Sequence, residues 1–212
     1  MNDPSKERSE AFLKAAYDLN DDAAMQRFYA EWAAEYDEQL EQGLGYLAPA
    51  KVCACFMRHF SDRDAPILDI GCGTGLTSIA LSKSGYSTID GLDFSAAMLE
   101  QAENRGFYRA LIQADLNAPL EIADSSYAAA LSSGTFTHGH VGAEPLDEIF
   151  RIIVPGGIFA CTIHNDVWQD LGFDKKIREL SESGKIEVVE QNLDLYFADG
   201  ARDGQYCVLR KN

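Results

Sequence analysis

Hydrophobic positions in the first part of the chain recur with the period of a helix. Between residues 20 and 43 the apolar side chains stand three or four positions apart, as one face of a helix requires; they are Met25, Phe28, Tyr29, Trp32, Ala33, Tyr36 and Leu40. A second stretch of this kind predicts a helix over 48–60, and Asp3-Pro4 is typical of a helix start. The first 64 residues are therefore predicted to be mainly helical.

The pattern changes at Pro66, where short apolar runs begin to alternate with helical stretches. The runs predict strands over 67–70, 88–93, 109–114, 127–132 and 158–163. Between them, helices are predicted over 76–83, 96–104 and 146–152. Strands that alternate with helices pair in parallel, and the helices then cover both faces of the sheet.

The last part of the chain departs from this alternation. Two further apolar runs, 186–197 and 205–210, are joined by only seven residues. Because so short a connection forms a hairpin and not a crossover, one of these strands must run antiparallel to the rest. We expect a single domain over 1–212, in which residues 1–64 form an N-terminal helical cap and residues 65–212 form an α/β core.

The charge of the chain excludes several classes of partner. With 18 Lys and Arg residues against 34 Asp and Glu residues, the formal net charge is −16. Binding to nucleic acid or to an anionic membrane needs clustered positive charge, and the basic residues here are scattered. We therefore expect neither nucleic acid nor a membrane as a partner.

The polar opening of the chain and its cysteines indicate a cytoplasmic protein. The first ten residues are polar, unlike a signal peptide, and no apolar run reaches the roughly 18 residues of a membrane span. The five cysteines are odd in number and thinly spread, which favours reduced thiols. Cys53-Ala-Cys55 has the wrong spacing for a redox or metal-binding pair, so no metal site is predicted.

A glycine-rich segment stands where ligands bind in α/β sheets. Gly71, Gly73 and Gly75 follow the predicted strand over 67–70 and open the next helix, which puts them at the carboxyl end of a strand. Glycine lets a ligand approach the backbone closely. A tight turn with no ligand could carry the same three glycines, so this motif alone is a weak signal.

Three acidic residues accompany the glycines. Asp69 precedes the first glycine, Asp93 ends the next strand, and Asp115 ends the strand after that. Since the carboxyl ends of neighbouring parallel strands meet at one edge of a sheet, these side chains are expected to line one site. Asp93 can accept from both hydroxyls of a ribose, and Asp115 from an adenine amine. Considered alone, each of these aspartates could also be a solvent-exposed residue at the end of a strand.

The charge of Asp69 discriminates between the candidate ligands. A pyrophosphate beside it would be repelled, whereas an α-ammonium group would be attracted. A dinucleotide-binding loop would also carry a third glycine at position 76, where this chain has Leu76. The pattern therefore favours an adenosine that bears a cationic arm, namely S-adenosylmethionine.

These segments resemble the motifs of the class I S-adenosylmethionine-dependent methyltransferases. Residues 67–75 (ILDIGCGTG) are similar to the first motif of that family, 91–95 to the second and 114–116 to the third. The resemblance covers about residues 24–210. It implies a Rossmann-like three-layer sandwich around a seven-stranded, mostly parallel sheet of order 3-2-1-4-5-7-6, with strand 7 antiparallel. It also implies S-adenosylmethionine as cofactor and S-adenosylhomocysteine as product.

The same resemblance assigns a set of cofactor-binding residues. They are Asp69, Gly71, Cys72, Gly73, Gly75, Asp93, Phe94, Met98, Asp115, Leu116, Ser132 and Ser133, with Tyr29, Trp32 and Tyr36 as a lid over the methionine end of the cofactor. The three lid residues could instead pack on the sheet. A narrower similarity, to the methyltransferase-like proteins of the Williams–Beuren region, rests on Tyr36-Asp37, on 45–49 and on 138–146.

The expected reaction is in-line methyl transfer to a small-molecule acceptor, which requires an aligned nucleophile and the exclusion of water. The chain lacks the Asn/Asp-Pro-Pro-aromatic motif of amino-base methyltransferases, and this weakens a nucleic-acid or protein-amide acceptor. His138 and His140 are the candidate catalytic bases and His164 is a weaker one, although each could simply hold the backbone. A non-catalytic S-adenosylmethionine-binding protein and a nicotinamide-dependent oxidoreductase stay open as alternatives, as does the oligomeric state.

Overall fold

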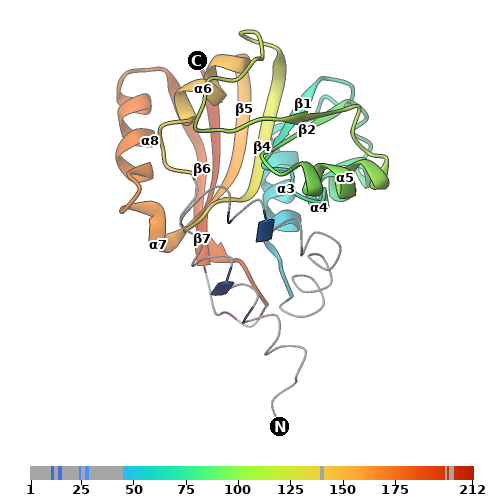
Figure 1. Cartoon of the computed structure of the whole chain (residues 1–212). Coiled ribbons are helices and arrows are strands. Elements are labelled where there is room, and N and C mark those ends of the chain that lie inside the picture. The colour runs from blue at the N-terminus through green and yellow to red at the C-terminus, as the bar shows by residue number, and fades with distance from the viewer. Residues whose placement is uncertain are drawn as a thin grey trace.

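The core of the molecule is one mixed sheet with helices packed on both of its faces (Figure 1). The computed structural model describes residues 11, 14, 15, 24, 27, 28, 45–138, 141–198, 200 and 203–212. Within these residues, seven strands lie in the order β3-β2-β1-β4-β5-β7-β6. The Rossmann-like three-layer fold predicted from the sequence is therefore confirmed, including its strand order.

Six strands of this sheet run in one direction and β7 runs against them. The strands are β1 Ile67–Ile70, β2 Ile89–Asp93, β3 Ala110–Gln113, β4 Tyr127–Phe136, β5 Ile153–His164, β6 Ile186–Leu195 and β7 Asp203–Lys211. The strands from β3 to β5 pair in parallel. β7 lies antiparallel between β5 and β6, as the short final connection predicted.

Helices follow the strands and cover the sheet. They are α3 Ala48–His59, α4 Leu76–Lys83, α5 Ala96–Arg105, α6 Leu146–Ile152, α7 Asn165–Trp168 and α8 Phe173–Glu182. α3 begins with a proline in its first turn, where the missing backbone N–H costs nothing. α5 begins at Ser95, whose hydroxyl accepts a hydrogen bond from the backbone N–H of Met98 at 3.3 Å.

Alternate residues of the central strands pack into two separate clusters. In β1, Leu68 and Ile70 join the cluster under α6 and α8, whereas Ile67 joins the cluster under α3 and α4. In β5, Phe159 joins the first of these clusters and Ile158 joins the second. Because side chains alternate across a strand, both faces of the sheet are apolar and both require a covering layer.

Several elements differ from their predicted bounds. β4 continues to Phe136, beyond the predicted end at 132, and β5 begins at Ile153, before the predicted start at 158. A register irregularity between β4 and β5 accommodates Pro155-Gly156-Gly157 inside the strand, since Tyr127 pairs with Ile153 and the next pairs restart beyond the glycines. The short helix α8 was not predicted, because its three buried apolar residues stand among charged ones.

The predicted helical cap is described only in part. The candidate lid residues Tyr29, Trp32 and Tyr36 lie outside the described residues, as does most of the segment 1–44. α3 is described, and it packs against β4 and β5. In the portion of the chain that the structure describes, no helix is long and apolar enough to cross a membrane.

Candidate functional site

The glycine loop between β1 and α4 is built for a close approach to its backbone. Gly71, Gly73 and Gly75 all have positive φ angles, of 63°, 53° and 92°, a left-handed conformation that other residues rarely adopt. A side chain at Gly71 would collide with Thr135 of β4. At Gly73, by contrast, no described atom beyond its own chain neighbours lies within 4 Å of the position a Cβ would take. The loop thus packs on β4 at Gly71 and has open space beside it at Gly73.

Asp93, at the end of β2, holds this loop in place. Its Oδ2 accepts a hydrogen bond from the backbone N–H of Gly73 and its Oδ1 accepts one from that of Ser95, both at 2.8 Å. Burial raises the pKa of Asp93, and the backbone hydrogen bonds oppose that rise. An ionised carboxylate has lone pairs left after two such bonds, so Asp93 can still accept from a ligand hydroxyl.

Asp69 lies fully buried beneath the same loop. Its Oδ2 accepts hydrogen bonds from the hydroxyls of Thr77 and of Tyr108, the latter at 2.5 Å. Its Oδ1 is buried and has no hydrogen-bond partner among the described residues. Burial raises the pKa of Asp69 to about 7. A buried carboxylate oxygen without a donor suits a cationic group, as the predicted α-ammonium of the cofactor would be.

The other cofactor candidates lie around this loop or along the same edge of the sheet. Asp115 accepts a hydrogen bond from the backbone N–H of Asn117 at 2.8 Å, and Leu116 beside it is buried. Ser132 donates to the carbonyl of Ile70 at 2.8 Å, so it braces β1. The buried hydroxyl of Ser133 has no hydrogen-bond partner in the described part of the chain. Phe94 is partly buried, while Met98 and Cys72 are buried.

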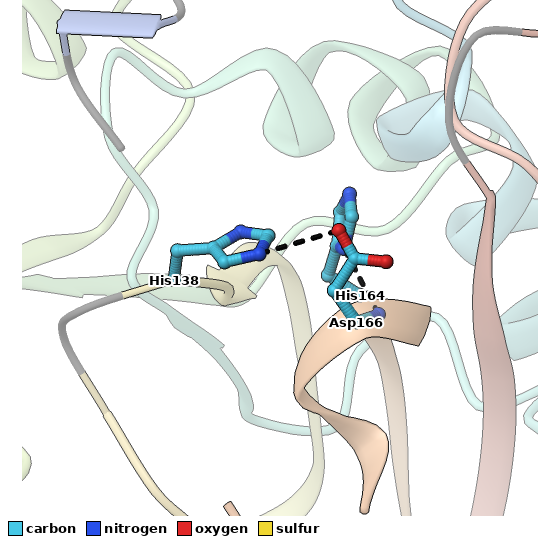
Figure 2. A group of neighbouring side chains, drawn as sticks. All are labelled: His138, His164 and Asp166. Carbon is cyan, nitrogen blue, oxygen red and sulfur yellow. Dashed lines mark hydrogen bonds and ion pairs between the residues drawn. The ribbon is translucent and has the colours of Figure 1, made fainter. Parts of the chain in front are cut away.

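Three side chains meet at the carboxyl ends of β4 and β5 (Figure 2). His138 comes just after β4, His164 ends β5, and Asp166 lies in α7. The Nε2 atom of His138 lies 3.3 Å from Oδ2 of Asp166, and Nδ1 of His164 lies 3.7 Å from the same oxygen. The two imidazole rings meet edge to face with centroids 4.9 Å apart. The other candidate base, His140, lies outside the described residues.

Aromatic rings border this group of side chains. The ring of Tyr196 packs edge-on against His164 with centroids 5.4 Å apart. The ring of Tyr46 stacks obliquely on Phe197, and its hydroxyl lies where a side chain at Gly134 would stand. Aromatic rings of this kind exclude water and pack on a flat or apolar ligand.

Three residues of the site were missed by sequence reasoning. Tyr108 and Thr77 hold Asp69, and Asp166 contacts both histidines. Tyr108 is 39 positions away from Asp69 along the chain, so no local pattern connects them. Asp166 stands two positions after His164, and this His-x-Asp spacing at a strand end was the one available signal.

Known proteins resemble both this sequence and this fold. Residues 67–157 match a family model described as a methyltransferase domain. Human methyltransferase-like protein 27 is 33% identical over 155 residues, which cover 72% of this chain and 62% of that protein. Human EEF1A lysine methyltransferase 2 is 24% identical over 182 residues, 80% of this chain and 74% of that protein.

Solved structures agree with these sequence matches. One similar structure is a chain from the complex between the Haloferax volcanii Trm112 methyltransferase activator and a methyltransferase. The two folds superpose with a TM-score of 0.66 at 21% sequence identity. The match covers 86% of this chain and 97% of that one. The chain described here spans 62% of the length of methyltransferase-like protein 27. With its glycine loop, its strand-end aspartates and its strand order, the chain has the fold of the class I S-adenosylmethionine-dependent methyltransferases and is similar to them in sequence.

Proposed function

We propose that this chain transfers the methyl group of S-adenosylmethionine to a small-molecule acceptor. The observation that supports the cofactor best is the pairing of an open glycine loop, tied down by Asp93, with the partnerless buried oxygen of Asp69. A loop of this kind accommodates an adenosine, and the buried carboxylate oxygen beneath it accommodates a cationic arm. A nicotinamide dinucleotide would instead bring a pyrophosphate toward Asp69 and be repelled.

The residues of this chain would act mainly by holding and shielding the reactants. When bound, the cofactor supplies an electrophilic methyl group on a positively charged sulfur. Asp93 would accept from the ribose hydroxyls, and Oδ1 of Asp69 would accept from the ammonium group. The open backbone at Gly73 would let the cofactor lie against the loop. Alignment of this kind is the main contribution an enzyme makes to an in-line displacement.

The acceptor would reach the site from the side of His138 and Tyr196. Two imidazoles and one carboxylate gather there beside aromatic rings, and this supports a role for them toward the proton of an acceptor. The net charge of −16 disfavours a nucleic-acid acceptor. A small acceptor bearing an ionisable group fits this chemistry best.

Incubation with methyl-labelled S-adenosylmethionine and a cell extract tests the proposal. The products are separated into small-molecule, protein and nucleic-acid fractions, and we expect label in the small-molecule fraction. The Asp93→Ala variant serves as the control, because it removes both oxygens that hold the loop. Label in protein would contradict the acceptor class. Binding of S-adenosylhomocysteine without any transfer would favour the alternative, a non-catalytic S-adenosylmethionine-binding protein.

A further inference from the structure

We propose that His138, His164 and Asp166 form a binding site for a divalent transition-metal ion such as Zn²⁺. Each residue offers one ligand atom, and the three atoms lie within 4.8 Å of one another. We refer to these residues as the metal triad. The two histidines stand at the carboxyl ends of neighbouring parallel strands, β4 and β5, so the sheet itself brings them together.

The spacing of the ligand atoms is near that of a real coordination shell. In a tetrahedral site with bonds of about 2.0–2.1 Å, two ligand atoms stand about 3.3 Å apart. Oδ2 of Asp166 lies 3.3 Å from Nε2 of His138 and 3.7 Å from Nδ1 of His164. The two nitrogens are at most 4.8 Å apart, so one ring must move by up to about 1.5 Å to reach that geometry.

The two histidine side chains differ in exposure, and the more exposed one is the one that would move. The side chain of His164 is 3% exposed and fixed at the end of β5, which suits an anchoring ligand. The side chain of His138 is 34% exposed and lies beyond the end of its strand, so its ring can move. In Figure 2 the ring of His138 points at the carboxylate of Asp166.

The hydrogen bonding of His164 makes Nδ1, the nitrogen that faces Asp166, an acceptor. Its Nδ1 accepts a hydrogen bond from the backbone N–H of Asp166 at 3.3 Å. An acceptor nitrogen carries no proton, so the lone pair of Nδ1 is turned toward Asp166. A metal ion between these groups would replace one long hydrogen bond with a coordinate bond.

The ligand set also indicates what the ion would do. Two neutral imidazoles and one carboxylate suit zinc and similar metals, and three protein ligands are typical of sites that keep one position open. A cation there would lower the pKa of a hydroxyl or thiol that reached it. The acceptor oxygen or sulfur would release its proton to solvent and bond to the methyl carbon as the carbon–sulfur bond of the cofactor breaks. This catalytic role rests on the proposed function, whereas metal binding itself does not.

Titration of the untagged, chelator-treated full chain with Co²⁺ and Zn²⁺ tests the site. We expect one equivalent of Co²⁺ to give visible d–d absorption without a thiolate charge-transfer band, because the five cysteines are buried and none of them belongs to the triad. Calorimetry with Zn²⁺ should show the same single site. A wild-type chain that binds neither ion, or that binds them only through thiolates, would overturn the proposal.

Matched variants locate the site. Asp166→Asn and His138→Gln should each weaken Zn²⁺ binding tenfold or more. Asp166 is 65% exposed on its side chain, so its substitution should leave the fold intact. His59→Gln is the control, because it also removes a histidine–carboxylate pair, with Glu190 at 2.8 Å, but far from the triad in sequence. Equal binding by all three variants would overturn the proposal, as would equal weakening in the His59→Gln control.

Discussion

Asp69 and Asp93 stand at the ends of neighbouring strands, and they differ in what their oxygens contact. Both oxygens of Asp93 accept backbone N–H groups, so this residue joins the loops after β1 and β2. Asp69 uses one oxygen for two hydroxyl donors and leaves the other without a partner among the described residues. Loss of Asp93 should therefore disturb the loop itself, whereas loss of Asp69 should change the charge beneath it.

The first prediction concerns the titration of Asp69. Between the ordinary pKa of an aspartic acid and about 7, the folded chain holds a proton that the unfolded chain releases. The stability from this carboxyl is therefore fully present only below the ordinary pKa of 3.8, and it is lost as the pH rises through about 7. We expect the free energy of unfolding of the wild type, relative to Asp69→Asn, to fall by on the order of 3 kcal/mol between about pH 4 and pH 8. Chemical denaturation at several pH values measures it.

Cofactor binding provides the control for this titration. A cationic arm beside Asp69 would favour its ionised form, so binding of S-adenosylhomocysteine near pH 6.5 should release a proton. Calorimetry in two buffers of different ionisation enthalpy detects this release, which should be absent in Asp69→Asn. A flat stability difference across the pH range would show that Asp69 ionises normally.

The second prediction concerns the open face of the glycine loop. Gly73→Ala should weaken binding of S-adenosylhomocysteine tenfold or more, because the new methyl group would stand in the space the cofactor needs. Gly85→Ala is the matched control, since Gly85 also has a positive φ of 87° and no described neighbour within 4 Å. Both variants should lose about 1 kcal/mol of stability. Equal affinities in the two variants would exclude the cofactor from this loop.

At the scale of elements, the helices and strands of the core were predictable where local pattern and tertiary setting agree. β1, α4 and α6 have their predicted bounds, because apolar runs there end at glycines or at helix-breaking residues. The start of β5 was not predictable, since Pro155-Gly156-Gly157 resembles a turn and becomes strand only through its pairing with β4.

The residues of the candidate site also fall into those that the sequence predicts and those that it does not. The glycine loop and the three aspartates were visible because each stands next to a strand end in the sequence. Tyr108 and Asp166 were not, because their roles arise from contacts that only the folded sheet creates. Tertiary proximity of this kind leaves no period or spacing in the sequence.

The third prediction concerns the start of α5, the helix that carries Met98. Ser95→Ala removes the hydroxyl that accepts the N–H of Met98, and it should cost about 1 kcal/mol of stability. For a chain of this size, we expect the melting temperature to fall by about 2–4 °C. Ser61→Ala, at an exposed serine outside the helices and strands, should change stability by less than about 0.5 kcal/mol. Equal losses would show that the cap contributes nothing specific.

At the scale of the whole molecule, the excess of acidic residues affects stability as well as partners. Sixteen uncompensated negative charges repel one another in the compact state. Many basic side chains are already engaged, as Arg151 is with Glu148 and Asp124. The remaining repulsion acts over distances that salt screens effectively, since the Debye length is about 10 Å at 0.1 M ionic strength.

The fourth prediction follows from this charge. Raising the sodium chloride concentration from about 10 mM to about 0.15 M should raise the melting temperature by several degrees, because screening weakens the repulsion more than it weakens the exposed ion pairs. Scanning calorimetry measures the shift, with a neutral solute of equal osmolarity as the control. A fall in melting temperature would mean that the ion pairs dominate.

The position of β7 between β5 and β6 fixes the order in which the sheet can be assembled. β6 precedes β7 in the chain, yet among the described strands it pairs only with β7. During synthesis on the ribosome, β6 therefore emerges before the strand it pairs with, and it must wait unpaired while β5 presents an open edge. The unpaired edges of β5 and β6 can pair with strands of other chains until β7 takes its place between them. The nascent protein is thus exposed to misassembly at this edge in the interval between these two strands.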